Sequence, residues 1–121
     1  MTQKILIIDD EQDIVETLQF TLETEGYECH TAFDGEEGLR LAKELFPDLI
    51  ILDVMMPKMN GFKICRLLKY DNAYKNIPII MLTARSQDED KSLGEETGAN
   101  EYVTKPFELE DIIQKIKGYL G

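Results

Sequence analysis

The chain has 121 residues, which is long enough for one hydrophobic core and too short for two. Hydrophobic residues make up 43% and charged residues 31%, a composition typical of a globular protein rather than of a disordered one. The net charge of −11 repels phosphate groups, which argues against direct binding to nucleic acid or to an anionic membrane surface.

Short apolar runs alternate with amphipathic segments five times along the chain. Three of the runs are nearly continuous in Ile, Leu, Val and Met, which is typical of strands buried on both faces of a parallel sheet. In chain order, the pattern predicts strands over residues 4–9, 27–32, 48–53, 77–82 and 101–104. It predicts helices over residues 11–25, 35–45, 61–72, 87–97 and 107–120.

Residues that begin or end helices support these assignments. Gly26 supplies a stop after the first helix. Asp34, followed by Glu37 three residues later, resembles a capping box at the start of the second helix. Asn60 is a favourable N-cap for the third helix.

The fourth predicted helix, residues 87–97, has a weaker pattern than the others. It contains one large apolar residue, Leu93, and a glycine, Gly94, in its middle. A glycine in a helix costs about 1 kcal/mol relative to alanine. We therefore expect this segment to be the least stable helix and to be mobile.

The alternation of strands and helices predicts an α/β fold. We expect residues 1–121 to form a single (βα)5 domain, a doubly wound five-stranded parallel sheet with helices on both faces. Such sheets place their functional sites at the carboxyl ends of the strands.

Polar residues gather at these predicted strand ends. The first strand ends in Asp9 and Asp10, Asp53 ends the third, Thr83 follows the fourth, and Lys105 follows the fifth. Three carboxylates in one small space repel one another, and a divalent cation removes that repulsion. Oxygen ligands without His or Cys favour Mg²⁺. Together with a hydroxyl and an ammonium group, they predict a phosphoryl-transfer site with Asp53 as the nucleophile.

Each of these residues taken singly has a simpler interpretation. Asp9 and Asp10 suit the N-terminus of a helix, and Asp53 suits the start of a turn. Thr83 is a common type of strand residue, and most lysines, including Lys105, lie at the surface. The functional interpretation depends on all five falling at the same edge of the sheet.

The chain resembles the receiver domain of two-component response regulators. The motifs that carry the resemblance are "IIDDE" at 7–11, "ILDVMMPKMNG" at 51–61, "MLTAR" at 81–85 and "EYVTKPF" at 101–107, in the order and at the spacing of the family. The resemblance covers essentially the whole chain, and it implies the strand order 2-1-3-4-5.

The resemblance assigns roles to the acidic residues. It implies that Asp53 accepts a phosphoryl group from a phosphohistidine, becoming an aspartyl phosphate. Asp10 would bind Mg²⁺ directly, Asp9 would bind it mainly through water, and Met55 would offer its backbone carbonyl.

The resemblance also implies a conformational switch. Thr83 and Lys105 would hold the phosphoryl oxygens, and Tyr102 would move inward when Thr83 swings towards them. The Lys105–Pro106 peptide bond would be cis. The chain would promote its own phosphorylation and dephosphorylation without being an enzyme that turns over an external substrate.

The expected partners are a sensor histidine kinase or phosphotransfer protein and a downstream effector protein or domain. We predict an output surface made of residues 87–97, Tyr102 and the exposed face of 107–120, through which the active form could also be a homodimer. The resemblance places kinase docking on the first helix near Ile14, Val15 and Leu18. The N-terminus has no signal-peptide pattern and no apolar run reaches about 18 residues, so we expect a cytoplasmic protein without a membrane partner.

Other functions fit the sequence less well. A nucleotide- or flavin-binding module needs a phosphate loop after the first strand, where this chain has "DDEQD". A hydrolase needs a second acid or base near Asp53, and His30 lies in the second strand, away from that edge. The main alternative is a receiver-like interaction module that is never phosphorylated, which should have lost one of the acids, Thr83 or Lys105.

Overall fold

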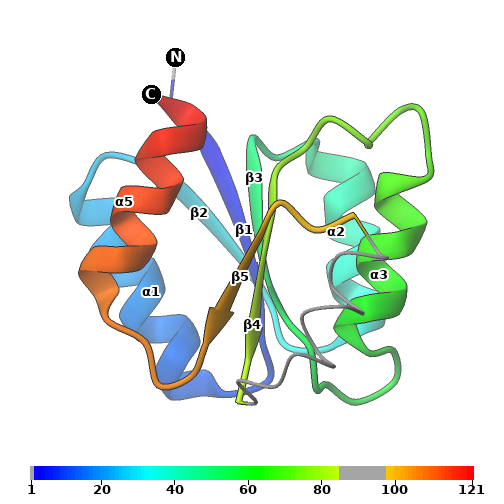
Figure 1. Ribbon diagram of the computed structural model, residues 1–121, viewed down its shortest axis with the longest axis horizontal. Helices are drawn as coiled ribbons and strands as arrows, with labels where there is room; N and C mark the ends of the chain where they lie inside the picture. The colour runs from blue at the N-terminus through cyan, green and yellow to red at the C-terminus, as the bar shows by residue number, and fades with distance from the viewer. Residues whose placement is uncertain (1, 85–97) are drawn as a thin grey trace.

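The computed structural model describes residues 2–84 and 98–121 and has an α/β architecture (Figure 1). Five strands form one parallel sheet in the order β2-β1-β3-β4-β5, which confirms the predicted topology. The strands are β1 (Lys4–Ile8), β2 (Glu28–Ala32), β3 (Leu49–Asp53), β4 (Ile79–Thr83) and β5 (Glu101–Thr104). The described helices are α1 (Gln12–Thr24), α2 (Gly35–Leu45), α3 (Gly61–Lys69) and α5 (Leu109–Leu120).

Helices cover both faces of the sheet. α1 and α5 lie on one face, and α2 and α3 lie on the other (Figure 1). Successive side chains of a strand point to opposite faces, so each central strand supplies both layers of the core. In β1, Ile5 and Ile7 pack on the α1 side, whereas Leu6 and Ile8 pack on the α2 side. This explains why the central runs are apolar throughout rather than alternating.

The predicted helix ends are confirmed by their backbone geometry. Gly26, which follows Glu25, the C-cap of α1, has a φ of 100°, a conformation that favours glycine. A side-chain oxygen of Asp34 accepts a hydrogen bond from the backbone N–H of Glu37 at 2.9 Å. Asn60 accepts one from the backbone N–H of Lys63 at 3.0 Å. These bonds satisfy N–H groups that the first turns of α2 and α3 leave without helical partners.

Several boundaries differ from the prediction. α3 ends at Lys69 rather than at residue 72, because a side-chain oxygen of Asp71 accepts a hydrogen bond from the N–H of Ala73 and starts a turn. β4 begins at Ile79 rather than at residue 77, because Pro78 has no N–H to donate to the sheet. The predicted helix over 87–97 lies outside the described residues.

The kinase-docking surface predicted on the first helix is wrong for two of its three residues. Val15 and Leu18 are each 1% exposed and belong to the core, while Ile14 is partly buried against it. The apolar face of α1 is needed to cover the sheet, so these side chains offer no surface to a partner. Among the described residues, no helix has the length and apolar character needed to cross a membrane.

Candidate functional site

The carboxyl ends of the strands bring the predicted site residues together. Asp53 is the last residue of β3 and Thr83 the last of β4, while Asp9 follows β1 and Lys105 follows β5. Register fixes this alignment: Asp53 pairs with Leu82, next to Thr83, and Thr83 pairs with Thr104, next to Lys105. A charged residue can therefore end the apolar run of β3, because the sheet stops there.

Lys105 links the acidic residues of the site. Its Nζ atom lies 3.0 Å from Oδ2 of Asp9, 3.2 Å from Oδ1 of Asp53 and 2.7 Å from Oε1 of Glu11. Its backbone N–H donates to the carbonyl of Thr83. Burial lowers the pKa of Lys105, but the carboxylates of Glu11 and Asp9 outweigh burial and raise it, so the ammonium group stays charged. The Lys105–Pro106 bond is cis, as the resemblance implies.

Two of the carboxylates are buried, which is unusual for aspartate. Asp9 is 0% exposed and Asp53 is 4% exposed. Burial and, to a lesser extent, the negative charge of Asp9 raise the pKa of Asp53 to about 6, against the ammonium group of Lys105, which lowers it. Burial also raises the pKa of Asp9, against the hydrogen bond that it accepts from the backbone N–H of Glu11. The folded chain thus holds these two groups together at an electrostatic cost.

The acidic cluster has the composition of a cation site. Carboxylate oxygens of Asp9, Asp10 and Asp53 lie within 4.8 Å of one another, and Asp10 is exposed. Oδ2 of Asp9 is buried, and in the described part of the chain it forms an ion pair with Nζ of Lys105 at 3.0 Å without a well-aligned hydrogen bond. A carboxylate oxygen has more than one lone pair, so this atom can also bind a cation or accept a hydrogen bond from the water of a cation. Hard oxygen donors of this kind suit Mg²⁺.

The loop between β3 and α3 carries Met55 and is held close to the phosphoacceptor candidate. A Cβ atom added to Gly61 would lie 2.2 Å from the carbonyl oxygen of Asp53, so only glycine fits there. The N–H of Gly61 donates to the carbonyl of Val54 at 2.8 Å. The side chain of Met55 is 61% exposed and is not part of the core.

The same loop packs against the start of α2. A Cβ atom on Gly35 would lie 2.1 Å from the carbonyl oxygen of Met59, so the two backbones are in direct contact. Nζ of Lys58 lies 3.5 Å from Oδ2 of Asp34, the N-cap of α2. The sequence pattern did not predict this contact, although the sequence does place a glycine at the first position of α2.

The two predicted switch residues lie on one face of the sheet. Thr83 is 1% exposed, and Tyr102 is partly buried against the core on the α2 side. Tyr102 pairs with Met81, two residues before Thr83, so the side chains of Tyr102 and Thr83 project from the same face on neighbouring strands. A movement of Thr83 would therefore change the space available to Tyr102.

Two further residues complete the comparison with the predicted site. His30 lies within β2, where its Nε2 atom contacts Oε2 of Glu28 at 2.6 Å, and it takes no part in the acidic cluster. Glu11 was missed, although its position directly after Asp9 and Asp10 was a signal for it. Its ion pair with Lys105 joins residues 94 positions apart in the chain, and only the fold reveals such a contact.

Comparison with known proteins agrees with this geometry. The model of the response regulator receiver domain family matches residues 5–117. The chain belongs to this family. Receiver domains are signalling switches of two-component systems rather than enzymes of the usual kind.

Two similar regulators are longer than this chain. The chain is 47% identical over 120 residues to the alkaline phosphatase synthesis transcriptional regulatory protein PhoP of Bacillus subtilis, covering 99% of the chain and 49% of PhoP. It is 44% identical over 117 residues to the DNA-binding dual master transcriptional regulator RpaA of Synechocystis, covering 97% of the chain and 48% of RpaA. The chain therefore spans about half the length of these relatives.

A solved structure confirms the fold. The Vibrio cholerae chemotaxis protein CheY4 superimposes with a TM-score of 0.92 at 36% sequence identity, covering 98% of this chain and 99% of CheY4. The receiver fold is thus shared over 98% of this chain.

Proposed function

We propose that this receiver domain is a phosphoacceptor switch that takes a phosphoryl group onto Asp53 from a phosphohistidine of a sensor kinase or phosphotransfer protein. The observation that carries the proposal is the ion-pair arrangement at the sheet edge, where the ammonium group of Lys105 contacts both buried carboxylates, Asp9 and Asp53. The carboxylate of Asp53 therefore lies beside a fixed positive charge at the edge of the sheet, as a nucleophile in phosphoryl transfer requires.

The transfer forms one bond and breaks one bond. A carboxylate oxygen of Asp53 bonds to phosphorus while the phosphorus–nitrogen bond of the phosphohistidine breaks, and the imidazole nitrogen keeps the electron pair. Lys105 and the hydroxyl of Thr83 hold the phosphoryl oxygens as the transfer proceeds. Hydrolysis of the acyl phosphate by water returns Asp53 to its resting form, so the domain acts on itself without turning over another substrate.

The acidic cluster is proposed to hold Mg²⁺. Asp10 and the backbone carbonyl of Met55 would bind the ion, with Asp53 beside them and Asp9 reaching it mainly through water. The buried Oδ2 atom of Asp9 supports this assignment, because it forms an ion pair with Lys105 but no well-aligned hydrogen bond within the described residues, and a cation site requires oxygen ligands. Bound Mg²⁺ would offset the negative charge of the phosphoryl oxygens and of the cluster.

Phosphorylation is proposed to change the conformation of one face of the domain. The phosphoryl group adds about −1.5 to −2 charges and new acceptor oxygens. Thr83 and Lys105 move towards these oxygens, and Tyr102 then fills the space on the α2 side of the sheet. The change alters the surface formed by residues 87–97, Tyr102 and the exposed part of 107–120, and so controls an effector protein or domain in the cytoplasm.

Intact-mass spectrometry after incubation with acetyl phosphate tests the acceptor. We expect the wild type to gain one phosphoryl group in a Mg²⁺-dependent reaction. Asp53→Asn should gain none, whereas Asp111→Asn, which removes an exposed carboxylate of α5, should react like the wild type. A phosphoryl group that survives in Asp53→Asn would mean that another residue is the acceptor. No reaction of the wild type with any small phosphodonor would favour an interaction module that is never phosphorylated.

A further inference from the structure

The outward face of α3 differs in charge from the rest of the chain. α3 contains Lys63, Arg66 and Lys69 and no acidic residue, whereas α1, α2 and α5 all contain acidic residues and the net charge of the chain is −11. Nζ of Lys69 donates to the backbone carbonyls of Ile77 at 2.6 Å and Lys75 at 3.2 Å, so this lysine stabilises the loop after the helix.

The other two basic side chains of α3 lie at the surface. Lys63 and Arg66 are exposed and lie three residues apart on the helix. Neither forms an ion pair with a carboxylate in residues 2–84 or 98–121. Arg40 and Lys117 do have such partners, Glu44 and Glu25, whereas the exposed Lys43 and Lys75 have none in the same residues.

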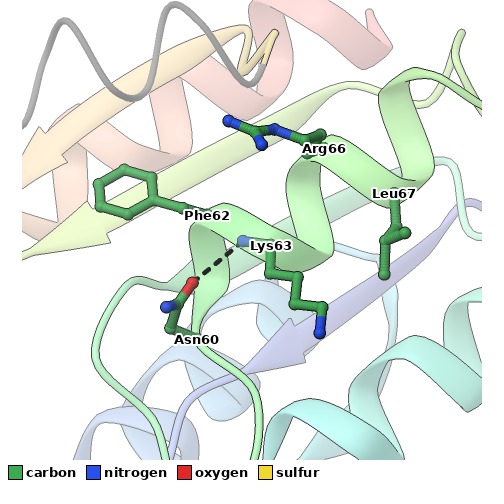
Figure 2. Close-up of a pocket in the computed structure, with 5 residues that line it drawn as sticks. All are labelled: Asn60, Phe62, Lys63, Arg66 and Leu67. Atoms are coloured by element: carbon green, nitrogen blue, oxygen red, sulfur yellow. Dashed lines mark hydrogen bonds between the residues drawn. The ribbon is translucent and has the colours of Figure 1, made fainter.

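Apolar side chains lie beside these charges and form a surface groove. A hollow of about 420 Å³ is lined by the N-cap of α3 and four residues of the helix, namely Asn60, Phe62, Lys63, Arg66 and Leu67 (Figure 2). Figure 2 shows Lys63 and Leu67 extending to the same side of the helix, and Phe62 and Arg66 extending away from them. Leu67 is 43% exposed, and Tyr70, at the end of the helix, is 73% exposed. Large apolar groups next to exposed charges are typical of interaction surfaces.

We propose that the α3 groove, residues 60–67, docks an acidic amphipathic segment of a partner protein. Apolar side chains of such a segment would cover Phe62 and Leu67, and its carboxylates would pair with Lys63 and Arg66. Arginine suits this role because its guanidinium group binds a carboxylate through two parallel hydrogen bonds. The proposal does not depend on phosphorylation of Asp53.

Charge decides between a partner and a second copy of this chain. Two copies that met through this face would bring Lys63 and Arg66 of each into contact with those of the other, and like charges at an interface are unfavourable. A copy that offered one of its acidic faces instead would form a head-to-tail contact. The resulting pair would still have a free basic face at one end and a free acidic face at the other, so further copies would add and form a chain of molecules. A separate acidic segment satisfies the groove without either problem.

Two designed helical peptides test the proposal by NMR. One carries leucine and phenylalanine on one face and glutamate on the flanks, and the other has lysine in place of every glutamate. We expect the acidic peptide to shift the backbone amide signals of residues 60–70 in the 15N-labelled protein, and the basic peptide to shift none. Raised salt should weaken binding, because the contacts are between exposed charges.

Variants with matched charge changes provide the control. Lys63→Glu/Arg66→Glu should bind the acidic peptide at least tenfold more weakly, whereas Arg40→Glu/Lys43→Glu, which makes the same change on α2, should bind it like the wild type. Equal loss in both variants, shifts centred outside residues 60–70, or no binding at millimolar peptide would overturn the proposal.

Stability and oligomeric state are measured alongside peptide binding. Lys63→Glu/Arg66→Glu should unfold at the same urea concentration as the wild type, and a lower midpoint would mean that the chain itself uses these charges. Arg40→Glu/Lys43→Glu should unfold at a slightly lower urea concentration, because it replaces the ion pair of Arg40 and Glu44 with two like charges. Sedimentation should show a monomer for unphosphorylated protein. Self-association that Lys63→Glu/Arg66→Glu abolishes would identify the occupant as a second copy and overturn the choice of partner.

Discussion

Replacing Asp53 with asparagine is expected to stabilise the Mg²⁺-free protein at neutral pH. Burial and the charge of Asp9 raise the pKa of Asp53 from 3.8 to about 6. A carboxyl group whose pKa is higher in the folded chain than in the unfolded chain favours folding at low pH. That contribution is complete below about pH 3.8 and is lost as the pH rises through about 6.

The size of the effect follows from this difference in pKa. Each pKa unit corresponds to about 1.36 kcal/mol, so ionised Asp53 lowers the free energy of unfolding by about 3 kcal/mol at pH 7.5 and by roughly half as much at pH 5. Asparagine has nearly the same shape and no charge. Lys105 keeps its contacts with Asp9 and Glu11 in the variant, so the substitution leaves no buried ammonium group without a partner.

Urea denaturation followed by circular dichroism, in EDTA at pH 7.5 and at pH 5, measures the effect. Asp53→Asn should be more stable than the wild type by up to about 3 kcal/mol at pH 7.5, with a smaller difference at pH 5. The control Asp111→Asn, at an exposed position, should change stability by no more than about 0.5 kcal/mol. A destabilised Asp53→Asn, or a gain that is the same at both pH values, would refute the electrostatic reasoning.

Three other predictions test the site and the core. Mg²⁺ at ten times its dissociation constant should raise the free energy of unfolding by about 1.4 kcal/mol, as seen in urea titrations, and Asp10→Asn should need more Mg²⁺ for the same gain. Gly35→Ala should weaken Mg²⁺ binding measured by calorimetry, because the added Cβ atom would displace the carbonyl of Met59 in the loop that carries Met55. The control Gly118→Ala, which has open space around the added atom, should bind Mg²⁺ like the wild type. Ile51→Ala, at a position that is 0% exposed, should cost about 2–5 kcal/mol in the same urea assay, and a loss below 1 kcal/mol would contradict the assigned core.

Local patterns in the sequence were sufficient to predict the strands and the described helices. The apolar runs identified all five strands, and capping residues such as Asp34 and Asn60 located the starts of two helices to the residue. Their end points were less accurate, because α3 stops where the side chain of Asp71 forms a turn, a competing local interaction that the helical period does not show.

The site was also largely predictable, for a reason that belongs to the fold class. Parallel strands all end at one edge, so Asp9, Asp53, Thr83 and Lys105 are brought together by topology alone. The resemblance placed a docking surface near Val15 and Leu18 of α1, although both side chains are in the core. An amphipathic pattern shows which residues share a face, and only the packed structure shows what covers that face.

The sequence by itself therefore determined the strand and helix order, the acidic cluster and the family, because each depends on residue type and spacing along the chain. The tertiary structure decided contacts between distant residues: the ion pair of Glu11 with Lys105, the packing of Gly35 on Met59, and the raised pKa of Asp53. It also showed that Lys63 and Arg66 have no carboxylate partner among residues 2–84 and 98–121. Distances, burial and charge pairing arise only when the chain folds, since they depend on which atoms come together and on how much water is excluded from around them.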